Sequence, residues 1–280
     1  MGLFTASDGV RIAFEDEGEG RPLVLLHGLM AHGGFFDPQR ALTDSFRLIR
    51  IDLRGHGRSP LNGHGEAASV ERAARDVAEL AEELELEAAL GVGWSLGASV
   101  LWRVLAGPAS HRFAGAVVVD MTPRVLNADD WSLGLSEEHC EARSEAIRAD
   151  FPAFAAAAAA AIFAQPIDEA RRPLADWAGE EFARNDAGAI GAMWQSLVAE
   201  DLRPVLGGIR QPTLVIHGGQ SHLYGAGTAD HIVAALPSAA SIRFEASGHA
   251  PHLEQPDLFN ATLRDFAAML PPVHPSTVNA

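Results

Sequence analysis

Short apolar runs alternate with segments of helical spacing along most of the chain, and this alternation constrains the fold more than any other feature. Each run is rich in valine, leucine or isoleucine and breaks at a turn, which is typical of strands buried on both faces of a parallel sheet. The runs comprise residues 21–28, 46–51, 88–94, 113–121 and 212–219, and a last strand is expected at 241–248. Such runs, separated by helices, predict an α/β fold with a mostly parallel central sheet.

The segments between the runs have the patterns of helices that flank a sheet. Residues 69–86 place apolar side chains on one helix face and acids on the other. Residues 95–107 predict a helix that ends in a Gly-Pro pair. Further helices are expected near residues 228–236 and 255–270. The sheet is therefore expected to be flanked by helices.

The strand pattern disappears between about residues 122 and 197, where aromatic residues and an alanine run replace it. The aromatic residues there include Trp131, Phe151, Phe154, Phe163, Trp177, Phe182 and Trp194. We expect a helical cap (122–197) with an apolar inner surface, inserted after the strand that ends near Asp120. The core would then comprise residues 1–121 and 198–271, and the polar, proline-rich residues 272–280 would form a flexible tail.

The sequence Gly93-Trp94-Ser95-Leu96-Gly97 lies directly between a predicted strand and a predicted helix. On such a sharp turn a serine hydroxyl is exposed, and the flanking glycines leave room where a Cβ would collide with the chain. The start of the helix also favours the negative charge of a developing oxyanion. Ser95 is therefore the candidate nucleophile, and Trp94 is expected to pack at the turn or support the pocket.

Three further segments complete a known pattern. A His-Gly pair at His27 ends an early strand, a glycine-rich loop at 52–59 follows the next strand, and SGHAPHLEQPDLFN (247–260) follows the last. With these segments in this order, the chain resembles the α/β-hydrolase superfamily of serine hydrolases over about residues 8–270. The segment LGVGWSLGA is most similar to bacterial carboxylesterases, including pimeloyl-carrier-protein methyl ester esterases.

The resemblance implies an oxyanion hole made by the backbone N–H groups of Leu29 and Leu96, which follow the His-Gly pair and the serine. Loss of one such donor typically lowers the rate about 100- to 1000-fold. The resemblance also implies that His249 is the general base, since Gly248 lets its loop turn back toward the nucleophile. His27 is then expected to be a structural residue that bridges loops.

The acid of the triad is not where the superfamily usually has it. The usual position is a Gly-x-x-Asp arrangement after the penultimate strand, and Ser221 occupies it here. A hydroxyl cannot offset the charge of an imidazolium, and an amide in place of the acid lowers kcat roughly 10⁴-fold in a serine protease. Asp120, at the same sheet edge as the serine, is the expected acid, although it could instead cap a loop or anchor the insertion. Ser221, His222 and Tyr224 are left to support His249 or to line the pocket.

Composition and charge exclude several classes of partner. The net charge of −16 argues against binding to nucleic acid or to an anionic membrane surface. The single cysteine, Cys140, cannot form an internal disulfide or a thiolate cluster. His222, His249 and His252 are not joined by a cluster of further ligands, and a zinc site needs three or four. We therefore expect neither a metal nor another cofactor.

Targeting signals are not evident in the sequence. The N-terminal residues have no basic segment followed by a continuous apolar one, so we expect no secretion signal. The alanine-rich run at 151–164 is shorter than the roughly 20 residues that a membrane-spanning helix needs. These patterns predict a cytoplasmic protein.

The sequence therefore predicts a serine hydrolase that cleaves a carboxylic ester through an acyl-enzyme on Ser95, with His249 as general acid and base and Asp120 as the triad acid. The substrate is expected to be a small ester or lactone with an apolar acyl or alkyl part, although packing of cap on core would need the same apolar residues. Lactonases, carbon–carbon bond hydrolases and acyltransferases use the same triad and stay open. So does a non-catalytic ligand-binding or signalling protein on this fold, against which the intact serine and histidine argue. The sequence leaves the oligomeric state open.

Overall fold

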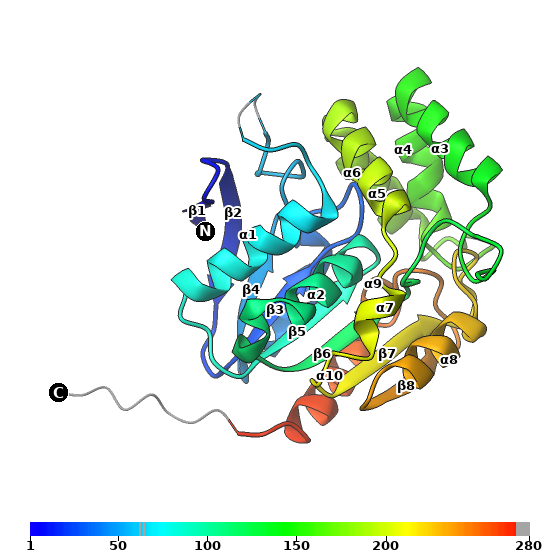
Figure 1. Ribbon diagram of the computed structural model, residues 1–280. Helices are drawn as coiled ribbons and strands as arrows, with labels where there is room; N and C mark the ends of the chain where they lie inside the picture. The colour runs from blue at the N-terminus through cyan, green and yellow to red at the C-terminus, as the bar shows by residue number, and fades with distance from the viewer. Residues whose placement is uncertain (62, 64, 273–280) are drawn as a thin grey trace.

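A computed structural model describes residues 1–61, 63 and 65–272 of the chain (Figure 1). Within these ranges an eight-stranded sheet has the order β1-β2-β4-β3-β5-β6-β7-β8. The strands are β1 (Gly2–Thr5), β2 (Arg11–Glu17), β3 (Arg21–Leu26), β4 (Phe46–Ile51), β5 (Ala89–Trp94), β6 (Phe113–Val119), β7 (Thr213–Gly218) and β8 (Ala239–Phe244). Neighbours from β4 to β8 along this order are parallel, whereas β1–β2 and β2–β4 are antiparallel.

The mostly parallel sheet predicted from the apolar runs is thus confirmed, and the two antiparallel edge strands are an addition to it. β3, β5 and β6 are buried along nearly their whole length, because helices cover both faces of the sheet. The predicted tail, apart from residue 272, lies outside the described residues.

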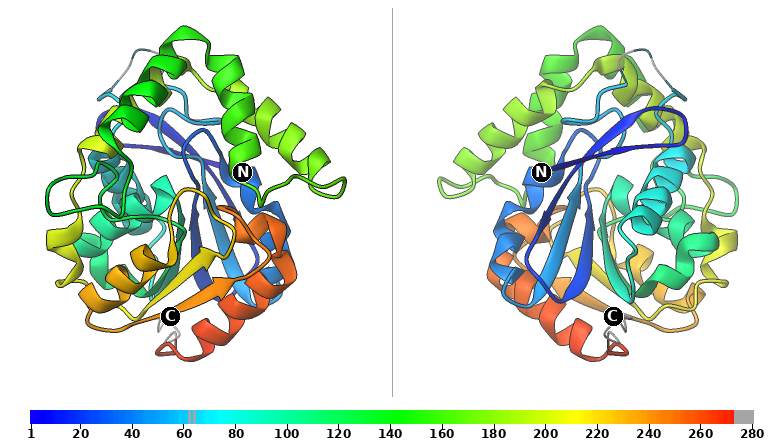
Figure 2. Two further views of the ribbon diagram at one scale, coloured as in Figure 1. Left: turned by 90° about the vertical axis from the view of Figure 1, so that its right-hand side faces the viewer. Right: turned by 90° about the vertical axis from the view of Figure 1, so that its left-hand side faces the viewer.

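Helices pack on both sides of this sheet (Figure 2). α1, α2 and α8 lie over one face, and the 3₁₀ helix η1 with α9 and α10 lies over the other. Their bounds are α1 (Val70–Glu83), α2 (Leu96–Ala106), α8 (Ala226–Ala235), η1 (Gly33–Leu42), α9 (Pro251–Glu254) and α10 (Pro256–Ala268). The connections η2 (Pro108–Arg112) and α7 (Arg203–Leu206) complete the core.

Of the five helices that the structure describes between β6 and β7, the first four rise above the ends of the strands (Figure 1). They are α3 (Glu137–Ala149), α4 (Phe151–Ala161), α5 (Arg172–Ala183) and α6 (Ala187–Ala199). The segment predicted to be helical (122–197) carries these helices from residue 137 onward, whereas residues 122–136 form turns and isolated bridges, and α6 ends two residues beyond it. The division of the chain into core and cap stays a prediction.

The alanine run forms α4 and packs closely on α5. Asp150 caps the helix, since its side chain accepts a hydrogen bond from the Ala153 N–H at 3.1 Å. The buried face of α4 includes Ala155 and Ala159, whose small side chains let the backbone of α5 approach. Within the described ranges, no helix is both long and apolar enough to cross a membrane.

Candidate active site

Ser95 occupies a strained turn between β5 and α2. Its backbone has φ 53° and ψ −122°, a conformation that costs a non-glycine residue roughly 1–3 kcal/mol. A Cβ placed on Gly97 would lie 2.1 Å from the Leu26 carbonyl oxygen, and one on Gly93 would lie 2.4 Å from the Gly97 carbonyl oxygen. Both glycines are therefore required for the turn. The Ser95 N–H donates to the Val119 carbonyl at 3.0 Å, which ties the turn to β6.

The loop after β3 passes directly beside this serine. A Cβ placed on Gly28 would lie 3.2 Å from the Ser95 Cβ, so the neighbouring Leu29 backbone is brought close to the nucleophile. Leu96 is the first residue of α2, where helical N–H groups have no intrahelical acceptor. Among the described residues, the N–H groups of Leu29 and Leu96 donate to no protein acceptor. Both groups are thus available for an oxyanion.

His249 and Asp120 form a buried pair although they are far apart in sequence. His249 Nδ1 lies 2.5 Å from Asp120 Oδ2, and the residues are 3% and 2% exposed. The backbone places Asp120 by a positive φ of 45° and by its N–H bond to the Ile216 carbonyl at 2.8 Å. Because a carboxylate can only accept, the geometry puts the imidazole proton on Nδ1. His249 Nε2 is then left as a proton acceptor.

Ser221 interacts with the aspartate rather than with the histidine. Its hydroxyl donates to Asp120 Oδ2 at 2.7 Å, the same oxygen that faces His249. The other carboxylate oxygen, Oδ1, accepts the Gly218 N–H at 3.2 Å. Three donors therefore fix the carboxylate at the end of β6, and the serine in the usual acid position becomes one of them.

A second carboxylate, which the sequence reasoning missed, holds the histidine loop. Glu254 accepts the Gly248 N–H at 2.7 Å and the Ala164 N–H at 2.8 Å, and it pairs with Arg171 at 3.2 Å. Burial raises the pKa of the Glu254 carboxyl. Trp94 also supports the loop, since its Nε1–H donates to the His249 carbonyl at 2.7 Å.

A small pocket brings the predicted nucleophile and base together. It encloses about 50 Å³ and is lined by Ser95 and His249. Its other lining residues are Gly28, Leu29, Met30, Trp94, Arg143, Phe154, Ala158, Ala161, Ile162, Phe182 and Leu223. Among the residues expected to support or line the pocket, Trp94 lines it and Ser221 bonds the aspartate.

The two other loop residues expected at the site lie around it. The Tyr224 ring centroid is 6.0 Å from that of His249, and His222 is exposed and does not line the pocket. Arg143 and Leu223 line it without having been predicted. Their sequence positions carry no motif, so only the packing of α3 and of the loop after β7 brings them to the site.

Two other histidines near the site are buried structural residues. His27 donates from Nδ1 to the Gly28 carbonyl at 2.7 Å and accepts the Leu53 N–H at Nε2, 2.9 Å away. It bridges two loops, as expected from its sequence position. Burial lowers the pKa of His27 to about 3, and burial also lowers that of His252 to about 3. Both imidazoles are therefore neutral.

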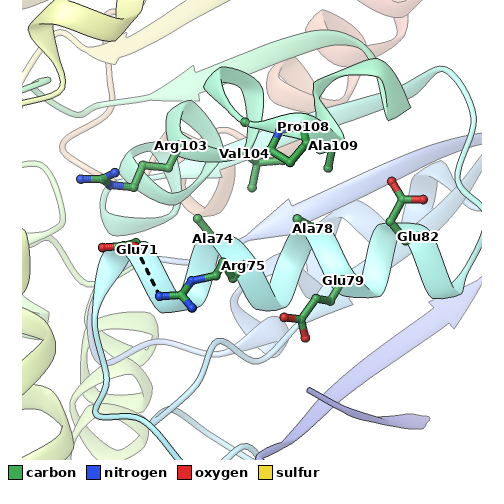
Figure 3. A pocket seen from close by; sticks show the side chains of 11 residues that line it. Glu71, Ala74, Arg75, Ala78, Glu79, Glu82, Arg103, Val104, Pro108 and Ala109 are labelled. Atoms are coloured by element: carbon green, nitrogen blue, oxygen red, sulfur yellow. Dashed lines mark hydrogen bonds and ion pairs between the residues drawn. The ribbon is translucent and has the colours of Figure 1, made fainter. Parts of the chain in front are cut away.

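A separate groove lies between α1 and the C-terminal end of α2 (Figure 3). Ala74, Ala78 and Val104 contribute to its floor, and charged side chains such as Glu82 and Arg103 stand at its edges (Figure 3). Ser95 lies at the other end of α2. At about 1.5 Å per helical residue, the backbone of Ser95 is roughly 12 Å from that of Arg103. This groove therefore does not belong to the Ser95 pocket. Across the residues that the structure describes, no three His, Cys, Asp or Glu side chains are grouped to hold a metal ion.

Comparisons with known proteins show the family of the chain. The model of the "Alpha/beta hydrolase family" matches residues 23–262. The pimeloyl-[acyl-carrier protein] methyl ester esterase of Nitrosomonas europaea is 31% identical over 255 residues, which are 89% of this chain and 96% of that protein. A non-heme haloperoxidase of Rhodococcus erythropolis is 28% identical over 95% of this chain and 99% of its own length.

A solved structure shows the same fold. An esterase from Exiguobacterium antarcticum superposes with a TM-score of 0.89 at 25% identity, covering 96% of this chain and all of its own. These relatives bear out the expected fold and support an ester hydrolase. Because the family model spans most of the sequence, the chain belongs to the alpha/beta hydrolase family.

Proposed function

We propose that the protein hydrolyses carboxylic esters through an acyl-enzyme on Ser95. The observation that carries this proposal is the buried pair of His249 and Asp120, with Nδ1 and Oδ2 2.5 Å apart, in a pocket that Ser95 also lines. The pair orients one tautomer and stabilises the imidazolium that forms when the histidine takes the serine proton. The esterase relatives support the same chemistry.

In this mechanism each step uses a group of the chain. His249 Nε2 accepts the Ser95 proton as Oγ attacks the ester carbon, and the N–H groups of Leu29 and Leu96 stabilise the oxyanion. The proton then passes to the leaving alcohol, and the acyl-enzyme forms. A water molecule, deprotonated by His249, releases the acid and regenerates Ser95. Asp120 holds the imidazole in the required tautomer throughout.

The size of the pocket limits the substrate. At about 50 Å³ it is far smaller than the roughly 300–1,000 Å³ typical of sites for drug-sized ligands. The pocket therefore accommodates only small substrates, such as methyl esters of short acids. A methyl ester is also what the name of the Nitrosomonas europaea relative specifies. We propose small alkyl esters as the substrate class. We also propose that the protein acts in the cytoplasm.

The experiment combines labelling with turnover. The wild-type protein should react covalently with a fluorophosphonate and hydrolyse p-nitrophenyl acetate, and Ser95→Ala should do neither. A wild-type protein that is folded yet neither labelled nor active would show that this is a non-catalytic member of the family. Parallel assays with lactones separate a lactonase from an esterase.

A further inference from the structure

One side chain of the catalytic pocket has no part in the hydrolytic mechanism. Arg143, on α3, lines the pocket together with Ser95 and His249. Apart from these three, the lining residues are apolar or glycine. A guanidinium is always charged, and its removal from water is unfavourable unless it finds a partner. Arg143 is half-buried and lies beside a nucleophile in an otherwise apolar pocket, where it offers its charge to a bound ligand.

The guanidinium is held in place by an aromatic ring. Arg143 Cζ lies 5.5 Å from the centroid of Trp194, on α6. The tryptophan is itself fixed to α3, because its Nε1 lies within hydrogen-bonding distance of Ser144 Oγ at 3.1 Å and of the Cys140 carbonyl at 3.3 Å. A cation–π contact orients a guanidinium without using its N–H groups. The N–H groups of the Arg143 guanidinium thus stay available in a defined position.

Among the described residues, no acidic side chain pairs with these N–H groups. In the part of the chain that the structure describes, Arg143 forms no ion pair and donates no hydrogen bond. All 21 basic residues are arginines, in a chain of net charge −16, so carboxylates are abundant. Fully buried arginines elsewhere, such as Arg54 and Arg72, are paired with them. Among the buried and half-buried arginines that the structure describes, Arg143 alone has neither an ion pair nor a hydrogen bond.

The charge of Arg143 reaches the catalytic end of the pocket. Burial raises the pKa of the Tyr224 phenol, and the charge of Arg143 opposes that rise. Tyr224 in turn lies beside His249, with ring centroids 6.0 Å apart. Arg143 is thus near enough to act on a substrate that is bound at Ser95.

We infer that Arg143 selects esters whose acid part carries a second, anionic group, by binding that carboxylate through its N–H edge. A guanidinium presents a planar fork of donors that matches a carboxylate. The small volume of the pocket keeps the anion close to the ester carbon, so monoalkyl esters of short dicarboxylic acids are the substrate class. This inference rests on the proposed ester hydrolysis.

The test compares an anionic and a neutral methyl ester of matched length, monomethyl glutarate and methyl pentanoate. For the wild type, kcat/KM should be at least roughly tenfold higher for the anionic ester, because a charge-assisted hydrogen bond is gained. Arg143→Gln should lower this ratio roughly 10- to 100-fold, and Arg143→Lys should keep part of it because its charge remains. Arg148→Gln, an exposed position on the same helix outside this pocket, should leave the ratio unchanged.

The possible failures are distinguishable. A wild-type ratio near one, with both esters hydrolysed, overturns the role of Arg143 and leaves the proposed function standing. A high ratio that Arg143→Gln does not change also overturns it. If no ester is hydrolysed at all and no fluorophosphonate reacts, the proposed function fails and this inference fails with it. Circular dichroism on each variant identifies one that does not fold, and Arg143→Lys then provides the second measurement.

Discussion

Replacement of Asp120 by asparagine tests the least expected member of the triad. In the structure Oδ1 accepts the Gly218 N–H at 3.2 Å, whereas Oδ2 faces His249 Nδ1 at 2.5 Å and the Ser221 hydroxyl at 2.7 Å. The amide oxygen must therefore face Gly218, since an NH₂ group there would oppose a donor. The NH₂ group then faces His249 and stabilises the tautomer that is protonated on Nε2.

That tautomer cannot accept the serine proton, and the imidazolium also loses its counter-charge. The expected loss is roughly 10⁴-fold in kcat, as for the corresponding change in a serine protease. This corresponds to about 5.4 kcal/mol of activation free energy, at 1.36 kcal/mol for each factor of ten. The assay is the hydrolysis of p-nitrophenyl acetate at pH 7.5, with circular dichroism and thermal melting to confirm the fold.

Ser221→Ala is the matched comparison, because it removes a donor from the same carboxylate oxygen. The bond between His249 and Asp120 remains, and Ser221 acts on the chemistry only through that carboxylate, so kcat should fall less than about tenfold, far less than in Asp120→Asn. The reverse ranking, in which Ser221→Ala is severely impaired and Asp120→Asn is nearly as active as the wild type, would refute the assignment.

Three further predictions follow from packing and burial. Gly97→Ala should lower the free energy of unfolding by roughly 3 kcal/mol, because the added Cβ would lie 2.1 Å from a backbone oxygen. Urea unfolding measures this loss. The control is Gly225→Ala, which should be much less destabilised because its added Cβ would meet nothing within 4 Å. His252 has a pKa lowered by burial to about 3, so below the unfolded-state pKa of about 6.5 only the unfolded chain gains its proton. The free energy of unfolding should therefore decrease as the pH is lowered from about 6.5 toward 3, and His252 should account for roughly 2–3 kcal/mol of the decrease at pH 4.5. In His252→Leu this contribution should be absent. Equal pH dependence of unfolding in the wild type and in His252→Leu would contradict the prediction. Finally, kcat/KM for p-nitrophenyl esters should decrease from acetate to octanoate because the pocket encloses about 50 Å³, and a rising series would show that the pocket opens.

The sequence predicts those features that local patterns encode. The apolar runs identify the central parallel strands β3, β5 and β6, because a strand covered on both faces has few polar positions. The turn at Ser95 is recognisable because two glycines are needed there, and the collisions that a Cβ would meet at Gly93 and Gly97 explain why. Asp120 could be predicted as the triad acid because the carboxyl ends of parallel strands lie at one edge of the sheet, the edge where Ser95 also lies.

Features that depend on packing over long sequence distances were not predicted. β1 and β2 pair antiparallel at the edge of the sheet, and their short sequences lack a continuous apolar run. Glu254 binds the backbone of Gly248 in the histidine loop and of Ala164 after α4, and Arg143 reaches the pocket from α3. Which face of α3 meets the pocket is decided by its packing against α4 and α6, and no periodic pattern in the sequence expresses that choice.

The central claim is that His249, oriented by Asp120, activates Ser95. The rate of covalent reaction with a fluorophosphonate measures this activation directly, with mass spectrometry of the labelled peptide to locate the adduct. We expect a single adduct on Ser95, formed at least about 100-fold more slowly in Asp120→Asn and at a rate within about tenfold of the wild type in Ser221→Ala. An adduct on another residue, or equal rates in the wild type and Asp120→Asn, would contradict the account.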